Sequence, residues 1–362
     1  MVTEQEVLTV LAKIQDPDLH RDIVSLGFIK DVHIVGGKVS FTIELTTPAC
    51  PVRKQMEEAA RTAVAALPGV HEVDVSMSSR VTTSHDRQSD FLPEVRNTIA
   101  VASGKGGVGK STVAANLAVA LRQAGATVGL MDADVYGPCI PKLMGASDAL
   151  QHTEDGKVVP PVQHGVKIMS MGFFLPKNEA VIWRGPMLHK MIQEFLGRVE
   201  WGELDYLVID LPPGTGDVQL SLCQTIPLTG AVIVSTPQDM ALEVASKAIL
   251  MFRKLNVPIL GIVENMSYYM CSHCGQRDDI FGHGGAREAS ARADMPFLGE
   301  IPLASAIRAS SDGGRPVALG SAADAISRSF HEVAGQLAAR ISTLNSRTGA
   351  GAPTHEPVLV IQ

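Results

Sequence analysis

The sequence has little of what secreted, membrane and nucleic-acid-binding proteins require. It contains five cysteines in 362 residues, and only Cys271 and Cys274 lie close together, so we expect a reducing compartment, the cytoplasm, and no disulfide framework. No apolar run approaches the roughly 20 residues that span a bilayer, and the acidic segment 1–7 does not resemble a signal peptide, so no stable membrane binding is expected. The net charge of -7 argues against nucleic-acid binding.

A glycine-rich loop is the most informative feature that the sequence does contain. Residues 104–111 read Gly-Lys-Gly-Gly-Val-Gly-Lys-Ser, between an apolar, β-branched run (97–103) and a segment with helical spacing (112–124). A strand that feeds a tight glycine turn and a helix N-terminus directs backbone N–H groups at an anion. Lys110 would neutralise phosphate oxygens and Ser111 would bind Mg²⁺. The predicted nucleotide contacts are Gly104, Lys105, Gly106, Gly107, Val108, Gly109, Lys110, Ser111 and Thr112.

Three aspartates follow predicted strands further along the chain. Asp132 and Asp134 come after the run 127–131, and Asp210 ends the run 206–209. A single aspartate at a strand end is often a cap or a surface charge, but three of them after a phosphate loop favour a hydrolytic site. Hydrolysis of a γ-phosphate needs an anchored Mg²⁺ and an oriented water. We assign Asp210 to Mg²⁺ through water, Asp134 to the attacking water and Asp132 to the support of either.

The fold class follows from the alternation of apolar strands and helices after residue 96. This rhythm predicts an α/β domain with a mostly parallel, doubly wound sheet, whose ligands lie at the carboxyl ends of the strands. Before it, a helical stripe, two strands joined by Gly36-Gly37, a second helix and a third strand predict a small α+β unit of order αββαβ. The expected domains are 1–77 (small unit), 78–95 (linker), 96–345 (nucleotide domain) and 346–362 (disordered tail).

The pair Cys271 and Cys274 has the spacing that lets two thiolates face one metal centre. One pair cannot complete a four-thiolate site, but two subunits related by a twofold axis would supply two pairs. The spacing alone allows zinc or an iron–sulfur cluster, with a redox dithiol as a third interpretation. His273 and His283 lie nearby, and we do not expect either to be a ligand.

The remaining cysteines carry weaker signals. Cys50 precedes a predicted helix at Pro51, and a helix N-terminus lowers a thiol pKa, so Cys50 is either a reactive thiol or a structural residue. Cys139 and Cys223 belong to no motif, and we interpret both as structural.

At this point the sequence resembles known families. Lys105 ahead of Gly-Gly-Val-Gly-Lys-Ser is similar to the deviant phosphate loop of the SIMIBI ATPases, a resemblance that implies that Lys105 reaches the nucleotide of the partner subunit in a homodimer. The segments 132–138, 210–217, 263–267 and 271–274 resemble the Mrp/ApbC iron–sulfur cluster carriers over about residues 95–340. That resemblance implies ATP hydrolysis, a [4Fe-4S] cluster bridging two subunits, and exchange with iron–sulfur scaffold proteins and apoprotein clients.

The resemblance also bears on two further regions. It implies that Asn265 reads the adenine edge, whereas the residue alone fits a turn after a strand equally well. The small unit is similar to the MIP-type domain associated with iron–sulfur assembly. Two other classes of function remain as alternatives: a MinD-like positioning ATPase with a structural zinc at the cysteine pair, and a metabolic ATP-dependent enzyme.

Overall fold

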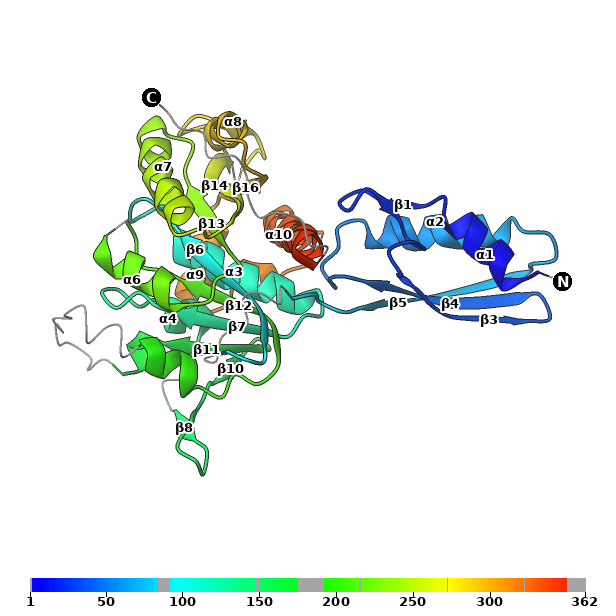
Figure 1. Cartoon of the computed structure of the whole chain (residues 1–362). Coiled ribbons are helices and arrows are strands. Elements are labelled where there is room, and N and C mark those ends of the chain that lie inside the picture. Colours follow the sequence, from blue (N-terminus) through cyan, green and yellow to red (C-terminus); the bar gives the residue numbers. More distant parts are fainter. Residues whose placement is uncertain are drawn as a thin grey trace. The chain divides into compact units, whose positions relative to one another are not determined.

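The computed structural model describes residues 2–83, 92–146, 150–174, 192–214, 216–271, 273–321 and 323–349. The chain forms two compact units (Figure 1). The first comprises Met1–Thr83 together with the chain from Ala338 onward, and the second comprises Ser84–Leu337.

The second unit is built on a nine-stranded sheet of order β10-β11-β7-β12-β6-β13-β14-β15, with β16 also paired to β14. The inner strands are parallel, whereas the short strands β10 and β15 pair antiparallel at the two ends of this order. The strands of this unit, including a separate pair β8 and β9, are β6 Val95–Ala102, β7 Val128–Asp132, β8 Gln151–His152, β9 Val158–Val159, β10 Val162–Gln163, β11 Val166–Ser170, β12 Leu204–Asp210, β13 Gly230–Ser235, β14 Ile259–Met270, β15 Arg277–Asp278 and β16 Phe297–Leu303.

Helices cover both faces of this sheet (Figure 1). Alternate side chains of β6 explain why: Ala100 and Ala102 join the core beneath α6 and α7, while Ile99 and Val101 are buried on the opposite face. Helix α3 packs against β6, β7 and β12. The helices are α3 Lys110–Gln123, α4 Ile140–Met144, α6 Asp217–Thr225, α7 Asp239–Lys254, α8 Gly285–Arg292, α9 Ser305–Asp312 and α10 Ala325–Gly349, with short 3-10 helices at Met171–Phe173 and Val317–Leu319.

The first unit is a three-stranded sheet of order β3-β4-β5 with its own apolar core. Strands β3 and β4 form the expected hairpin, in which Gly36 and Gly37 both have positive φ, as a tight turn requires. Strand β5 pairs parallel to β4. The elements are α1 Glu4–Leu11, β1 Gln15–Asp16, β2 Arg21–Asp22, β3 Ile29–Val35, β4 Lys38–Leu45, α2 Arg53–Ala65 and β5 Glu72–Ser79.

The predicted fold class is confirmed in both units, and the differences concern where elements end. Strand β14 runs on to Met270, seven residues beyond the run 259–263 from which it was predicted, because the short strand β15 continues its pairing. Helix α10 reaches Gly349, past residue 346 at which the sequence places the start of the tail. The rest of that expected tail, 350–362, and residues 84–91 of the expected linker lie outside the described residues.

Candidate nucleotide site and cysteine hairpin

The glycine loop lies between the buried central strand β6 and the N-terminus of α3. Gly107 and Gly109 have φ of 81° and 79°, a left-handed conformation in which glycine is favoured. A Cβ at Gly107 would meet open space, so the loop leaves room for a ligand on this side. Gly109 is the N-cap of α3 and offers no side-chain cap, which leaves the first N–H groups of the helix available to an anion.

Lys110 and Asp210 form a buried ion pair beside this loop. The Lys110 ammonium lies 2.5 Å from Asp210 Oδ1, and the two side chains are only 6% and 0% exposed. Burial raises the pKa of the Asp210 carboxyl, while the Lys110 ammonium and the Ser111 hydroxyl lower it. Asp210 Oδ2 is buried without a hydrogen-bond partner among the described residues. A buried acceptor of this kind is a position at which a cation or a water would be bound.

Asp132 lies directly beside Asp210, because β7 and β12 pair these two residues in register. Its carboxylate accepts hydrogen bonds from the N–H groups of Asp134 and Ile140 and from the Ser170 hydroxyl, at 3.0 to 3.2 Å. Burial, with a smaller contribution from the negative charge of Asp210, raises the Asp132 pKa to about 7. Asp132 therefore lies at the site and also stabilises the loop after β7 through these hydrogen bonds.

Asp134 lies on the wall of a cavity of about 400 Å³. Its Oδ1 accepts from the N–H groups of Tyr136 and Gly137, so part of the carboxylate shapes the loop. Gln219 of α6, which the sequence did not single out, also lines this cavity; it is 1% exposed, and neither polar atom of its amide has a partner among the described residues. The lining residues are Asp134, Tyr136, Gly137, Pro212, Pro213, Gly216 and Gln219.

Asn265 lies on β14 and contacts the glycine loop. Its side-chain amide donates to the carbonyl oxygen of Val108 at 2.8 Å, and a Cβ at Gly109 would lie 2.3 Å from the same nitrogen. The next residue, Met266, has a φ of 56°, and the pairing of β14 with β16 shifts register between Asn265 and Tyr269. Asn265 is thus at the predicted site, where it holds the loop itself.

Lys105 and Thr112 flank the centre of the loop, and both side chains are half-buried. The Ser103 hydroxyl donates to the Lys105 carbonyl oxygen at 2.9 Å and so fixes the backbone there. The Lys105 ammonium makes no salt bridge with any residue that the structure describes.

Cys271 and Cys274 lie on the turn of a hairpin formed by β14 and β15. The ladder consists of two residue pairs, Tyr269 with Asp278 and Met270 with Arg277, and is extended by a bond from the Cys271 N–H to the Gln276 carbonyl oxygen at 2.9 Å. The Gly275 N–H donates to the Cys271 carbonyl oxygen at 2.9 Å, which closes the turn.

The electrostatics of this turn favour a thiolate at Cys271. Backbone N–H groups of Cys274 and His273, and the Cys274 side chain, lower the Cys271 pKa, and Cys274 is exposed. A short exposed loop with N–H groups directed at a sulfur is suited to bind a metal centre through thiolates.

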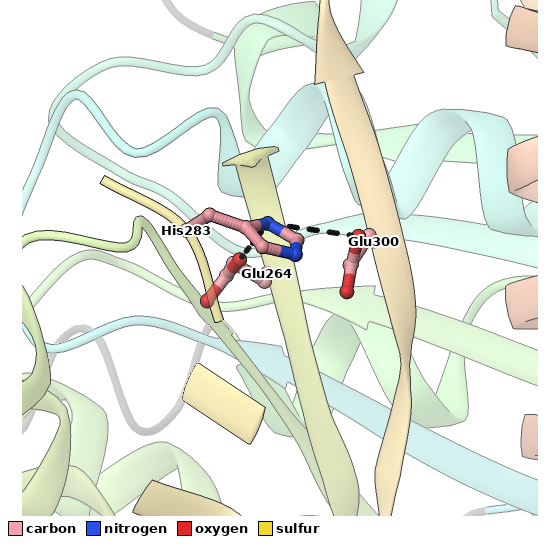
Figure 2. A group of neighbouring side chains, drawn as sticks. All are labelled: Glu264, His283 and Glu300. Carbon is pink, nitrogen blue, oxygen red and sulfur yellow. Dashed lines mark ion pairs between the residues drawn. The ribbon is translucent and has the colours of Figure 1, made fainter. Parts of the chain in front are cut away.

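A second group of side chains lies beside this hairpin (Figure 2). His283 Nδ1 is 3.9 Å from both Glu264 Oε1 and Glu300 Oε2, and the group is compact enough for a metal ion. However, its ligand atoms already have partners. Arg277 lies 2.7 Å from His283 Nδ1, and Glu264 accepts from the Ser267 hydroxyl and from the N–H groups of Gly284 and Ala286. Sequence reasoning missed this group, because its members meet only through strand pairing.

The other three cysteines differ from Cys271 in their surroundings. Burial, together with the negative charges of Asp16 and Asp18, raises the Cys50 pKa to about 11, opposite to the lowering expected from the helix N-terminus. Burial likewise raises the Cys223 pKa to about 12. Cys139 caps α4 near Ser111, so this residue lies closer to the nucleotide site than its lack of a motif suggested; burial raises its pKa, while the Ser111 hydroxyl lowers it.

Three features together define a P-loop NTPase: the glycine loop, the buried lysine–aspartate pair and the parallel sheet. Residues 94–338 match the model of the NUBPL iron-transfer P-loop NTPases, and residues 4–76 match the model of iron-sulfur cluster assembly proteins. The chain therefore belongs to the NUBPL iron-transfer P-loop NTPase family, which confirms the resemblance found in the sequence.

Individual relatives agree with this assignment. The chain is 48% identical to the iron-sulfur cluster carrier protein of Synechocystis sp. over 94% of this chain and 99% of the relative. It is also 48% identical to the iron-sulfur cluster carrier protein of Deinococcus radiodurans, over 98% and 99% of the two chains.

Solved structures resemble the nucleotide domain. A nucleotide-binding protein from Archaeoglobus fulgidus in complex with ADP has a TM-score of 0.58 and 44% identity, over 65% of this chain and 93% of that one. MinD from Pyrococcus horikoshii, complexed with Mg-ADP, shares the fold with a TM-score of 0.51 and 23% identity, over 66% of this chain and 94% of that one. In the part of the chain that the structure describes, no helix has the length and apolarity to span a membrane.

Proposed function

We propose that this chain binds and hydrolyses ATP and carries an iron–sulfur cluster, a [4Fe-4S] cargo held between two copies of the chain. The observation that carries this proposal is the course of β14. One residue of that strand, Asn265, donates to the P-loop carbonyl of Val108, and six residues later the same segment presents Cys271. A change in the loop on nucleotide binding therefore has a short covalent route to the cysteine pair.

The nucleotide half of the proposal is supported by the fit of the described residues to a triphosphate and Mg²⁺. The left-handed glycines and the uncapped N-terminus of α3 provide a cradle for phosphate, and Lys110 is the cation beside it. Ser111 and the unpartnered Oδ2 of Asp210 would hold Mg²⁺, with Asp132 behind them. When bound, Mg²⁺ would neutralise charge on the transferring phosphate.

Two further residues complete the proposed chemistry of hydrolysis. Asp134, on the cavity wall, would orient the attacking water. Lys105, which makes no salt bridge with a described residue, would stabilise charge on the nucleotide of the partner subunit.

The cargo half is supported by the thiolate character of Cys271 and the exposure of Cys274. Two copies related by a twofold axis would supply four thiolates, which is the ligand set of a [4Fe-4S] cluster. The relatives from Synechocystis sp. and Deinococcus radiodurans are named iron-sulfur cluster carriers. We infer that a scaffold protein donates the cluster and that apoproteins accept it. Cys50, with its raised pKa, would act as a thiolate only where a partner relieves the desolvation of its half-buried side chain.

Anaerobic reconstitution with iron and sulfide tests the proposal. The wild type should give a cluster chromophore and elute as a dimer, and Cys271→Ala should lose both. Cys50→Ala is the matched control and should keep them, because Cys50 lies in the other unit of the chain. A full chromophore in Cys271→Ala would refute the proposed cargo site, and so would a loaded protein that is monomeric. Uptake of zinc without visible bands would assign the hairpin to a structural metal instead.

A further inference from the structure

The cysteine hairpin is too short to hold its own shape. Its ladder has two residue pairs, and both residues of β15, Arg277 and Asp278, are exposed. An isolated two-stranded ladder is marginally stable in water even when it is longer than this one. Two cysteines that must hold the same geometry in two copies of the chain therefore need an anchor outside the ladder.

Arg277 is placed to be that anchor. It lies three residues after Cys274 and pairs with Met270 of β14. Its guanidinium stacks 4.2 Å from the centre of the Tyr268 ring, and its Nε donates to Asp279 at 2.8 Å. A third contact, 2.7 Å between Nη2 and His283 Nδ1, connects the hairpin to the segment that precedes α8.

The chemistry of this third contact fixes the role of His283. A guanidinium has donors and no acceptor, so Nδ1 of His283 is the acceptor in this contact. The Ser267 hydroxyl lies 3.3 Å from the same nitrogen, and the carboxylates of Glu264 on β14 and Glu300 on β16 are each 3.9 Å from it (Figure 2).

Glu264 ends this chain of contacts in the core of the domain. Its carboxylate is fully buried and accepts three hydrogen bonds, from the Ser267 hydroxyl at 2.6 Å and from the N–H groups of Gly284 and Ala286 at 3.1 and 2.7 Å. The last two belong to the N-terminus of α8, where a negative charge is favourable. The hairpin is thus tied to two strands and one helix.

This arrangement also argues against a metal ion within the Glu264, His283 and Glu300 group. The nitrogen that would bind the metal faces the guanidinium of Arg277 at hydrogen-bond distance. A divalent cation there would have to displace Arg277 and break the contact that anchors the hairpin. Glu300 already forms an ion pair with Arg287 at 3.1 Å, and Glu264 already accepts three hydrogen bonds.

We propose that Arg277, which contacts His283 beside Glu264 and Glu300, is the positioning residue for the cysteine pair; we call these four side chains the Arg277 clasp. The proposal rests on the proposed function, because it gives the clasp its purpose, namely to hold Cys271 and Cys274 in the geometry that binds metal. Residues behind metal ligands commonly contribute a factor of about 10 to 100 in metal affinity.

Cobalt(II) binding to the full chain, followed by the absorption of cobalt thiolates, tests the clasp. Arg277→Ala and His283→Ala should each weaken binding by about 10- to 100-fold. His283→Asn, whose Oδ1 can accept at the position of Nδ1, should restore most of the affinity. Arg308→Ala, which removes an exposed arginine paired only with Asp312 among the described residues, is the matched control and should bind as the wild type does.

Hydrogen exchange separates failure of the clasp from failure of the proposed function. The Cys271 and Gly275 amides should exchange faster in Arg277→Ala than in Arg308→Ala, with melting temperatures that match, whether or not metal binds. If cobalt absorption is the same in the wild type and in Cys271→Ala, the proposed cargo site is wrong, and exchange alone decides on the clasp. Exchange rates in Arg277→Ala that equal those of the wild type would overturn the clasp. If the wild type binds cobalt, an equal cobalt affinity in Arg277→Ala would overturn it as well. Arg277→Lys replaces the alanine variant if the alanine variant does not fold.

Discussion

At the scale of single residues, the nucleotide site contains buried charges of both signs that lie next to one another. Asp132 and Asp210 lie side by side at the ends of two paired strands, and the buried ammonium of Lys110 forms an ion pair with Asp210. Two neighbouring carboxylates cannot both ionise freely in such a place. Burial is the main reason that Asp132 has a pKa of about 7 instead of its ordinary 3.8, and the negative charge of Asp210 adds to the shift.

The shift at Asp132 makes stability depend on pH. The folded state keeps a proton on Asp132 up to about pH 7 that the unfolded state releases near pH 3.8, so the free energy of unfolding should fall as pH rises through this window. The free energy of unfolding of the wild type minus that of Asp132→Asn should decrease by up to about 1.4 kcal/mol for each unit by which the pH rises in this window. Urea unfolding at pH 5 to 8 measures it. Parallel curves for the two proteins would contradict the raised pKa.

Gln219 gives a second prediction at this scale. Its amide is buried without a partner among the described residues, and such a group costs about 1–3 kcal/mol. Gln219→Met, an apolar residue of similar length, should therefore raise the free energy of unfolding of the ligand-free protein by about 1 kcal/mol or more. Gln224→Met, on the exposed side of the same helix, should change it by less than about 0.5 kcal/mol. Loss of stability in Gln219→Met would show that the amide has a partner.

At the scale of elements, β14 connects the phosphate loop to the cysteine hairpin. Asn265 fills the space beside Gly109, and Met266 follows in a left-handed conformation that is unusual for a residue with a side chain. Such positions are retained where the surrounding structure requires them, and here the strand changes its pairing with β16.

A double-mutant cycle measures this connection. Gly109→Ala should lose stability from its φ of 79° and from overlap with the Asn265 amide, whereas in an Asn265→Ala background only the first cost remains. We expect a coupling free energy of about 1–3 kcal/mol from chemical denaturation. Gly107→Ala, with a φ of 81° and open space around its Cβ, is the control and should be additive with Asn265→Ala. Additivity in both pairs would disprove the steric connection.

The sequence predicted the elements and motifs that depend on neighbouring residues, and missed what depends on pairing across the sheet. The phosphate loop could be predicted because its glycines, lysine and serine are consecutive, and Asp210 because it ends an apolar run. The Arg277 clasp could not, because Glu264 and Glu300 meet only through the pairing of β14 with β16. The sequence left Cys50 open between a reactive and a structural residue, because it does not show burial, and desolvation outweighs the helix N-terminus there.

At the scale of the whole molecule, the two units match two different family models, one at residues 4–76 and one at 94–338. The proposed cargo site needs a second copy of the chain, because one cysteine pair offers only two thiolates. The proposed role of Lys105 needs a second copy as well. Both proposals therefore make activity depend on how subunits combine.

Mixing two inactive variants tests this dependence. Lys105→Ala and Lys110→Ala should each abolish ATP hydrolysis as homodimers. In a mixed dimer, the subunit with Lys110 intact receives Lys105 from its partner, so an equal mixture should recover about a quarter of wild-type activity, by random pairing with one intact site per mixed dimer. Phosphate release after co-refolding measures this. No recovery, in dimers shown to be mixed, would mean that Lys105 acts within its own subunit.

The contact between Lys110 and Asp210 would govern how a divalent ion enters the nucleotide site. The ammonium pairs with Oδ1 of the carboxylate whose Oδ2 the incoming divalent ion would use, so the negative charge of that carboxylate is already neutralised before the ion arrives. The ion should gain access only when a polyphosphate draws the lysine away. Nucleotide and metal would then enter and leave the site together.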